Sequence, residues 1–163
     1  MSSTVPTVRQ INWISTVPHL IVMGSIIFIW YLLFPNESVI LGSFTYLVLS
    51  FLLRTQIPKI HRKGVKLVKA EEFETAIPYF KESYEFFEAH NWIDKYRFVT
   101  LLSSSRMSYQ EMALANIAFC YGQLGNGEQS KAYYTRTLEE FPGNGLAKAS
   151  LSLLKSTEKE TIV

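Results

Sequence analysis

The stretch "EFETAIPYFKESYEFF", residues 72–87, decides the fold of the larger part of this chain. Within it the small residue Ala76 precedes the aromatic Phe80 by about one helical turn, and the small Ser83 follows three residues later. At the 3.6-residue period of an α-helix these three side chains share one face. Small residues let a second helix approach closely, and the aromatic ring fills the space between the two helices. The stretch therefore predicts one half of a closely packed antiparallel helix pair.

A second copy of this spacing occurs later in the chain. The positions that carry it are Leu114, Ile117, Ala118, Tyr121, Gly125, Ser130, Tyr134, Thr137 and Pro142. This order of apolar, small and aromatic residues, closed by a proline, resembles the tetratricopeptide repeat, a helix pair of 34 residues. The first copy has Ile60, Gly64, Leu67 and Phe73 at the earlier positions of the same pattern. It departs from the family at Lys63, where an apolar residue is usual, and at Glu71, where a glycine is usual.

The resemblance implies a domain order for the second part of the chain. The repeats are expected at residues 57–90 and 108–142, with an inserted helix at 91–107 between them. Ser108 and Glu111 have the spacing of a capping box that begins a helix. Residues 143–163 are expected to form a last amphipathic helix, which in this family caps the open end of the array, and a tail. The predicted fold class is all-α, with a helix-pair solenoid domain.

An apolar region precedes the repeats. Residues 17–34 carry no charge when histidine is counted as neutral, and neither do residues 38–53. Between them lies the polar turn "PNES", residues 35–38. Each segment approaches the ~30 Å thickness of a bilayer's hydrocarbon core. We therefore expect a transmembrane helical hairpin at residues 17–53, preceded by an N-terminal segment at 1–16. The alternative is a buried hairpin of a soluble protein, but no polar face interrupts either segment.

Small residues indicate where the two expected membrane helices meet. Folding the hairpin about Glu37 places Gly24 opposite Ser50. Small side chains at such a position let two membrane helices pack closely.

Lysine and arginine residues predict the orientation of the hairpin. The turn has none, Arg9 precedes the first segment, and the basic stretch 54–69 follows the second. The cations of this stretch that we expect at the membrane surface are Arg54, Lys59, Arg62, Lys63 and Lys66. Because positive residues stay in the cytoplasm, we expect an integral membrane protein with both termini and the repeats on that side. Anionic lipids are the expected partner of these cations. Nucleic acid is disfavoured, because residues 54–69 contain no aromatic side chain for base stacking.

The sequence predicts no catalytic, cofactor-binding or metal site. His19, His61 and His90 each lack a second histidine ligand three or four residues away. The chain has no H-E-x-x-H, no phosphate-binding glycine loop and no G-x-S-x-G. The single cysteine, Cys120, lies in an apolar run, which favours a small buried side chain over a reactive thiol. We therefore expect that the protein is not an enzyme and uses no cofactor.

The resemblance also implies a function. In tetratricopeptide repeats the inner helices line a concave groove that takes a peptide or helix of another protein. The positions expected to face this groove are His61, Val65, Lys69, Met112, Ala115, Phe119 and Gln123. Val65 stands where members that clamp a carboxylate have an asparagine, so an apolar ligand is expected here.

The expected role is that of a membrane-anchored adaptor or scaffold for a protein or peptide partner. One alternative makes the hairpin the functional part, in an assembly factor or accessory subunit of a membrane complex. A further alternative concerns Phe119 alone, whose ring the inserted helix would then cover.

Overall fold

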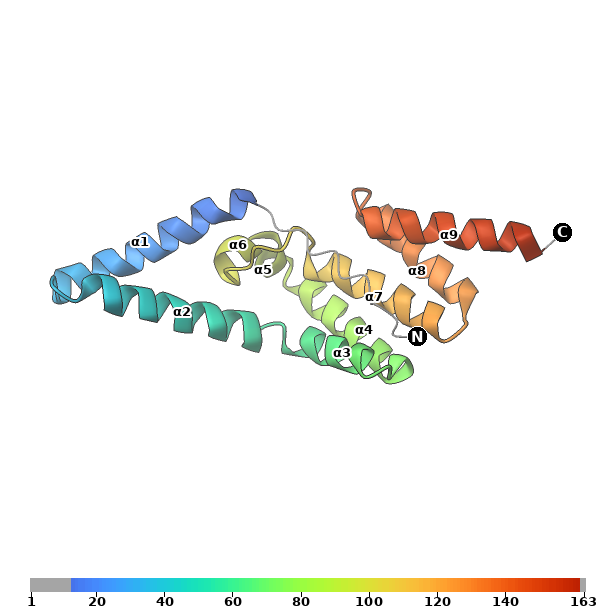
Figure 1. The fold of residues 1–163 in the computed structure, drawn as a ribbon, viewed down its shortest axis with the longest axis horizontal. Coiled ribbons are helices and arrows are strands. Elements are labelled where there is room, and N and C mark those ends of the chain that lie inside the picture. Colours follow the sequence, from blue (N-terminus) through green and yellow to red (C-terminus); the bar gives the residue numbers. More distant parts are fainter. Residues whose placement is uncertain (1–12, 162–163) are drawn as a thin grey trace. The chain divides into compact units, whose positions relative to one another are not determined.

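Helices make up most of the described part of the chain. The computed structural model describes residues 13–161, which form nine α-helices and contain no β-strand (Figure 1). The predicted all-α class is therefore confirmed. Most of the N-terminal segment predicted at 1–16, including Arg9, and the last two residues of the tail lie outside the described residues.

The chain divides into two compact units. Among the described residues, the hairpin unit comprises residues 13–59 and 91–106, and the helical module comprises residues 60–90 and 107–161. The inserted segment thus belongs with the apolar hairpin rather than with the expected repeats that flank it in sequence. Each unit is described below by itself.

Two long apolar helices form most of the hairpin unit. A short 3-10 turn, Trp13–Ser15, leads into α1, Thr16–Leu33, and a turn connects it to α2, Ser38–Gln56. Both helices are long and apolar enough to cross a membrane, with mean hydropathies of 1.9 and 1.5. The 18 residues of α1 span about 27 Å. The unbroken apolar runs of the sequence therefore become two helices joined by the predicted polar turn.

Gly42 of α2 lies against Ile27 of α1 at the contact between the two helices. The buried residues of α2 are Ser38, Gly42 and Ser50. A Cβ atom added to Gly42 would lie 2.6 Å from the Ile27 Cγ1 atom and 2.8 Å from the Ile27 Cα atom. The expected close approach at Gly24 is absent, because a Cβ atom there would meet nothing within 4 Å. The closest-packed glycine of the hairpin is therefore Gly42, and a hydrogen bond, 3.0 Å from Trp30 Nε1 to Thr45 Oγ1, adds a polar link between α1 and α2.

The inserted segment forms two short helices instead of the single one expected. These are α5, Asn91–Lys95, and α6, Arg97–Thr100. Tyr96 between them has φ −101° and ψ 26°, outside the helical range. After α6 the chain folds back, and the Ser103 amide donates to the Arg97 carbonyl over 3.0 Å. The break therefore allows the segment to turn back on itself within the hairpin unit.

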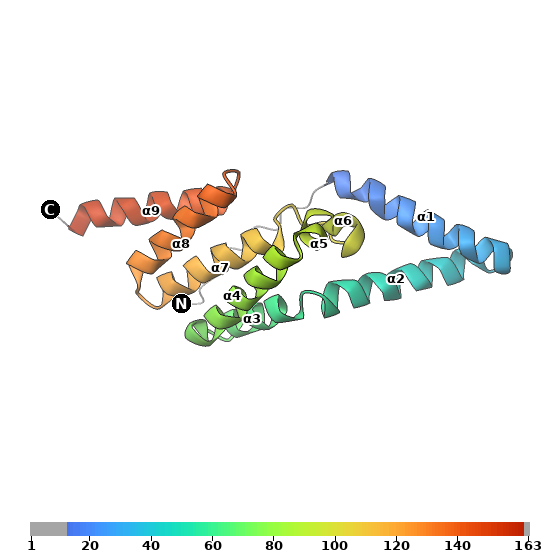
Figure 2. The same cartoon turned by 180° about the vertical axis from the view of Figure 1, so that it is seen from behind.

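Five helices make up the helical module (Figure 2). They are α3, Lys59–Lys69, α4, Phe73–Ala89, α7, Tyr109–Gln123, α8, Gly127–Glu140, and α9, Gly145–Thr161. Helix α4 packs against α7, α7 against α8, and α8 against α9. The Ser108 and Glu111 capping box begins α7, as predicted, and the Asn144 side chain accepts from the Ala147 amide at the start of α9.

The small–aromatic–small residues lie where helices of the module touch. In the first copy Phe80 and Ala76 are fully buried, and a Cβ atom added to Gly64 of α3 would lie 2.9 Å from the Phe80 ring. In the second copy Ser130 is buried, and a Cβ atom added to Gly122 would lie 3.2 Å from the Ser130 hydroxyl oxygen. Both copies thus use a glycine of one helix to admit a side chain of the next.

The turns after α3 and α7 share an unusual backbone conformation. Glu71 has φ +62° and Gly125 has φ +75°, both in the left-handed region that favours glycine. Glu71 therefore adopts the conformation that Gly125 has in the second copy. This conformation is less favourable for a residue with a Cβ atom than for glycine.

Candidate functional site

The seven positions expected to line a groove differ in their accessibility. His61 and Ala115 are buried, Val65, Met112 and Phe119 are half-buried, and Lys69 and Gln123 are exposed. His61 and Ala115 are therefore covered in this conformation, which leaves Val65, Met112, Phe119, Lys69 and Gln123 accessible. Helical spacing alone could not show that neighbouring helices cover His61 and Ala115.

His61 is a packing residue between three helices. Its ring contacts Phe80 of α4 and Tyr109 of α7 edge-on, with centroid distances of 5.3 Å in both cases. Its Nδ1 atom lies 3.1 Å from the Ser83 hydroxyl. Burial lowers the pKa of His61 from 6.5 to about 4, because the charged imidazolium would lose its hydration. The folded module therefore holds His61 neutral at physiological pH.

This burial predicts a pH-dependent stability. Between pH 6.5 and 4 the unfolded chain protonates His61 and the folded chain does not, so stability is full above pH 6.5 and is lost as the pH falls. Lowering the pH from 7.5 to 5 should cost about 2 kcal/mol through this residue. Denaturant unfolding of the full chain in detergent micelles measures it. His61→Gln, which can still bond Ser83, should show a smaller loss, and an equal loss in both proteins would contradict the account.

An apolar surface remains at the predicted groove. Phe119 of α7 and Phe73 of α4 contact each other edge-on, with ring centroids 6.0 Å apart. Val65, Phe73 and Phe119 all pack, partly buried, against one core cluster. Lys69 and Gln123 are exposed near the ends of α3 and α7. The accessible part of the predicted groove is therefore apolar, with polar residues at the helix ends.

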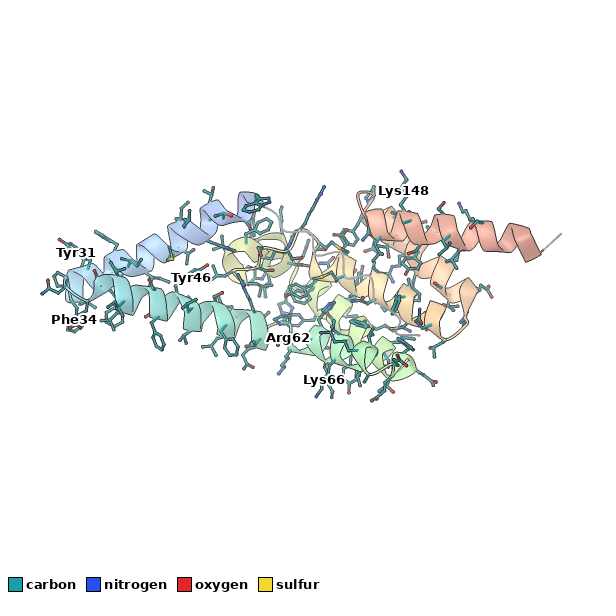
Figure 3. The ribbon with its side chains drawn as sticks, viewed as in Figure 1. Tyr31, Phe34, Tyr46, Arg62, Lys66 and Lys148 are labelled. Carbon is teal, nitrogen blue, oxygen red and sulfur yellow. The ribbon has the colours of Figure 1, made fainter. Side chains whose placement is uncertain are left out.

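Helix α3 separates its charges from its core-facing side. Its buried residues are His61, Gly64 and Val68. All five of its cations, Lys59, Arg62, Lys63, Lys66 and Lys69, are exposed. Figure 3 shows Arg62 and Lys66 projecting away from the neighbouring helices of the module. Lys63 also lies over the Tyr79 ring, with its Nζ atom 4.4 Å from the ring centroid. Four of the five predicted membrane-surface cations are therefore on one exposed face.

The fifth, Arg54, has a different environment. It lies in the last turn of α2, and its guanidinium donates to the carbonyl oxygen of Leu102 in the inserted segment. Only Ile57 and Pro58 separate α2 from α3 along the chain. Arg54 thus ties the inserted segment to the hairpin, a role that its charge alone did not indicate.

A polar cluster between α4 and α8 was not predicted from the sequence. The Tyr84 hydroxyl donates to Glu140 over 2.8 Å, and the Arg136 Nε atom donates to the other Glu140 oxygen over 2.7 Å. Burial and this hydrogen bond raise the pKa of Tyr84 to about 12. The i, i+4 spacing of Arg136 and Glu140 was visible in the sequence, but the contribution of Tyr84 from another helix was not. The arrangement links α4 to α8 through the Tyr84–Glu140 hydrogen bond.

The remaining candidates for chemistry are structural or dispersed. Cys120 is fully buried, and burial raises the pKa of its thiol to about 12, which disfavours the reactive thiolate. Over residues 13–161, no three side chains of His, Cys, Asp or Glu come together as a metal site would require.

Comparisons with known proteins identified no relative of this chain. No family model, no curated protein and no solved structure matches the chain.

Proposed function

We propose that this protein is a membrane-anchored adaptor, in which the hairpin α1–α2 crosses the membrane and the helical module binds a protein partner in the cytoplasm. The observation that carries the proposal is the outward-facing apolar surface of the hairpin. The large apolar side chains of α1 and α2 that are more than half exposed include Val17, Leu20, Ile21, Phe28, Ile29, Leu32, Leu33, Val39, Ile40, Phe44, Leu47 and Phe51. A soluble protein rarely leaves such a surface in water.

The distribution of side chains within the hairpin supports a lipid environment. Gly42 of α2 faces Ile27 of α1, and large apolar residues face outward, which is the arrangement of membrane helix pairs. Tyr31 and Phe34 project at the turn end of the hairpin (Figure 3), where aromatic side chains suit a membrane–water interface. A core hairpin of a soluble protein would have the opposite pattern, with its large apolar residues inside.

Charge supports the orientation of the proposal. The hairpin turn has no lysine or arginine, whereas α3 directly follows α2 and exposes five cations. Positive residues remain cytoplasmic, and each cation near an anionic leaflet contributes about 1 kcal/mol to its attraction. The exposed face of α3 is therefore proposed to contact anionic headgroups, with the turn on the opposite side of the membrane.

The packing of the module supports its interpretation as two tetratricopeptide-like repeats. Ala76, Phe80 and Ser83 are each at most 1% exposed, and the same holds for Ser130 and Thr137. Burial of these positions at helix contacts agrees with the small–aromatic–small spacing of the repeat. In the proposed function, a partner's apolar peptide or helix contacts the accessible groove residues Val65, Met112 and Phe119, and Lys69 and Gln123 lie at the C-terminal ends of α3 and α7.

Substitution of Phe119 tests partner binding. A photo-crosslinking residue at Phe119 should capture a specific protein in native membranes, and the same residue at exposed Ala132 of α8 should not capture it. Phe119→Glu should reduce recovery of that protein by at least about tenfold, because an apolar ligand would have to bury the new charge. Circular dichroism must show unchanged helix content in the variant.

Exchange of the hairpin distinguishes the second candidate function. Replacing residues 1–53 with an unrelated two-helix anchor of the same topology should leave capture from Phe119 intact. If the exchange abolishes capture and Phe119→Glu does not, the hairpin is the functional part, as in an assembly factor or accessory subunit. Capture that survives both changes would contradict both functions.

A further inference from the structure

The inner side of the inserted segment is buried and hydrogen-bonded within the hairpin unit. Leu101 and Leu102 are fully buried, and Asp94 is 1% exposed. The Thr100 hydroxyl donates to the Ile93 carbonyl over 2.6 Å, and the Arg97 side chain donates to the Asp94 and Ser105 carbonyls over 3.0 Å each. These contacts connect α5, α6 and the residues that follow them.

The same contacts place the segment at the open end of the hairpin. Helix α6 packs against α1, where the His19 ring lies beside the Phe98 backbone. Arg54, in the last turn of α2, donates to the Leu102 carbonyl. His19 is in the first turn of α1, and both residues therefore lie at the end opposite the turn. If the hairpin spans the membrane as proposed, this end is at the cytoplasmic boundary of the hydrocarbon.

The outer side of the segment is apolar and aromatic instead of polar. Trp92, Tyr96 and Val99 are 61%, 56% and 51% exposed. Trp92 and Tyr96 are one helical turn apart, since the Tyr96 amide donates to the Trp92 carbonyl over 3.1 Å at the end of α5, and Val99 follows in α6. A segment with apolar residues on both its inner and its outer side is not suited to water. Tryptophan and tyrosine are the side chains enriched at membrane–water interfaces.

The charges of the segment fit the cytoplasmic leaflet. Lys95 and Arg106 are exposed, and the single acidic residue of 91–106, Asp94, is buried. Lys95 also lies near the Tyr96 ring, with its Nζ atom 5.7 Å from the ring centroid. A membrane leaflet has anionic headgroups over apolar acyl chains. Exposed cations beside aromatic side chains suit such a surface.

We infer that residues 91–100 form an interfacial membrane anchor, with Trp92, Tyr96 and Val99 inserted among the lipids of the cytoplasmic leaflet beside the open end of the hairpin. The inference rests on the proposed membrane-spanning hairpin and adds a third contact of the chain with the same membrane. The inferred role also accounts for the insertion between the two expected repeats. The chain would then contact the membrane surface both before and after α4 in the sequence.

Tryptophan quenching by brominated lipids tests this inference on the full chain in liposomes that contain anionic phospholipid. One variant keeps only Trp92 (Trp13→Phe, Trp30→Phe), and a second keeps only Trp30 (Trp13→Phe, Trp92→Phe). A third carries Ala132→Trp, on the exposed face of α8, with the three native tryptophans changed to phenylalanine. Lipid brominated near the headgroup end of the acyl chain should lower Trp92 emission about twofold, as expected for a side chain 5–10 Å deep. Trp30 should also be quenched, and Ala132→Trp should not be.

The three variants separate the outcomes. Quenching of Trp30 without quenching of Trp92 would overturn the inference while leaving the membrane hairpin in place. Absence of quenching in both would overturn the hairpin as well. Equal quenching of all three variants would mean that the module itself enters the lipid, which also contradicts an anchor confined to residues 91–100.

Discussion

Phe80→Ala should destabilise the helical module by about 3–5 kcal/mol, the range for removal of a fully buried aromatic side chain. The Phe80 ring is 0% exposed, contacts the His61 ring, and lies against Gly64, which has no side chain that could fill the space left behind. Because Phe80 belongs to the core cluster shared by α3, α4 and α7, the loss should affect all three helices. Denaturant unfolding of the full chain in micelles, followed by circular dichroism, measures the change.

A matched control keeps this test specific. Leu153 of α9 is 68% exposed, so Leu153→Ala should change the free energy of unfolding by less than about 0.5 kcal/mol. If Phe80→Ala costs no more than Leu153→Ala, the small–aromatic–small residues do not form the contact described here.

Gly42→Ile should separate the two helices of the hairpin. The new side chain would begin 2.8 Å from the Ile27 Cα atom, and because a backbone atom cannot rotate away, the helices have to move apart. The expected cost is at the upper end of the ~1–3 kcal/mol range for overpacking. Spin labels at exposed Val17 and Leu52, in lipid nanodiscs, should report a longer and broader distance than in the unsubstituted hairpin.

Gly24→Ile supplies the control for the hairpin. Gly24 also lies in an apolar helix, but an added Cβ atom meets nothing within 4 Å, so the same substitution should leave the distance between the labels unchanged. A larger effect at Gly24 than at Gly42 would favour the helix register expected from the sequence over the observed one.

The difference between these two glycines shows what periodicity can and cannot predict. The apolar runs predicted helices that agree closely with the observed α1 and α2, because an unbroken apolar stretch has few other folds available. The contact between them depends on helix rotation and on where the turn begins. Folding the sequence symmetrically about Glu37 fixes neither, and the register it gave is wrong.

Long-range contacts explain the other differences. The capping box at Ser108 was predictable because its two hydrogen bonds are local. The burial of His61 was not, since it depends on Phe80 and Tyr109, which lie in other helices. The cations of α3 were correctly expected to be exposed, whereas Arg54 is engaged with Leu102, a partner 48 residues away. Spacing thus identified faces of helices, and the tertiary fold decided which residues of those faces remain accessible.

Thiol labelling of the hairpin turn tests the central claim most directly, which is that the hairpin crosses the membrane with the helical module on the cytoplasmic side. Asn36 in the turn is exposed, and so is Ser156 of α9. The native thiol of Cys120 is fully buried and gives a low background. Asn36→Cys should react with a membrane-impermeant maleimide in intact cells, and Ser156→Cys should react only after lysis. Labelling of Ser156→Cys in intact cells, or of Asn36→Cys only after lysis, would contradict the account.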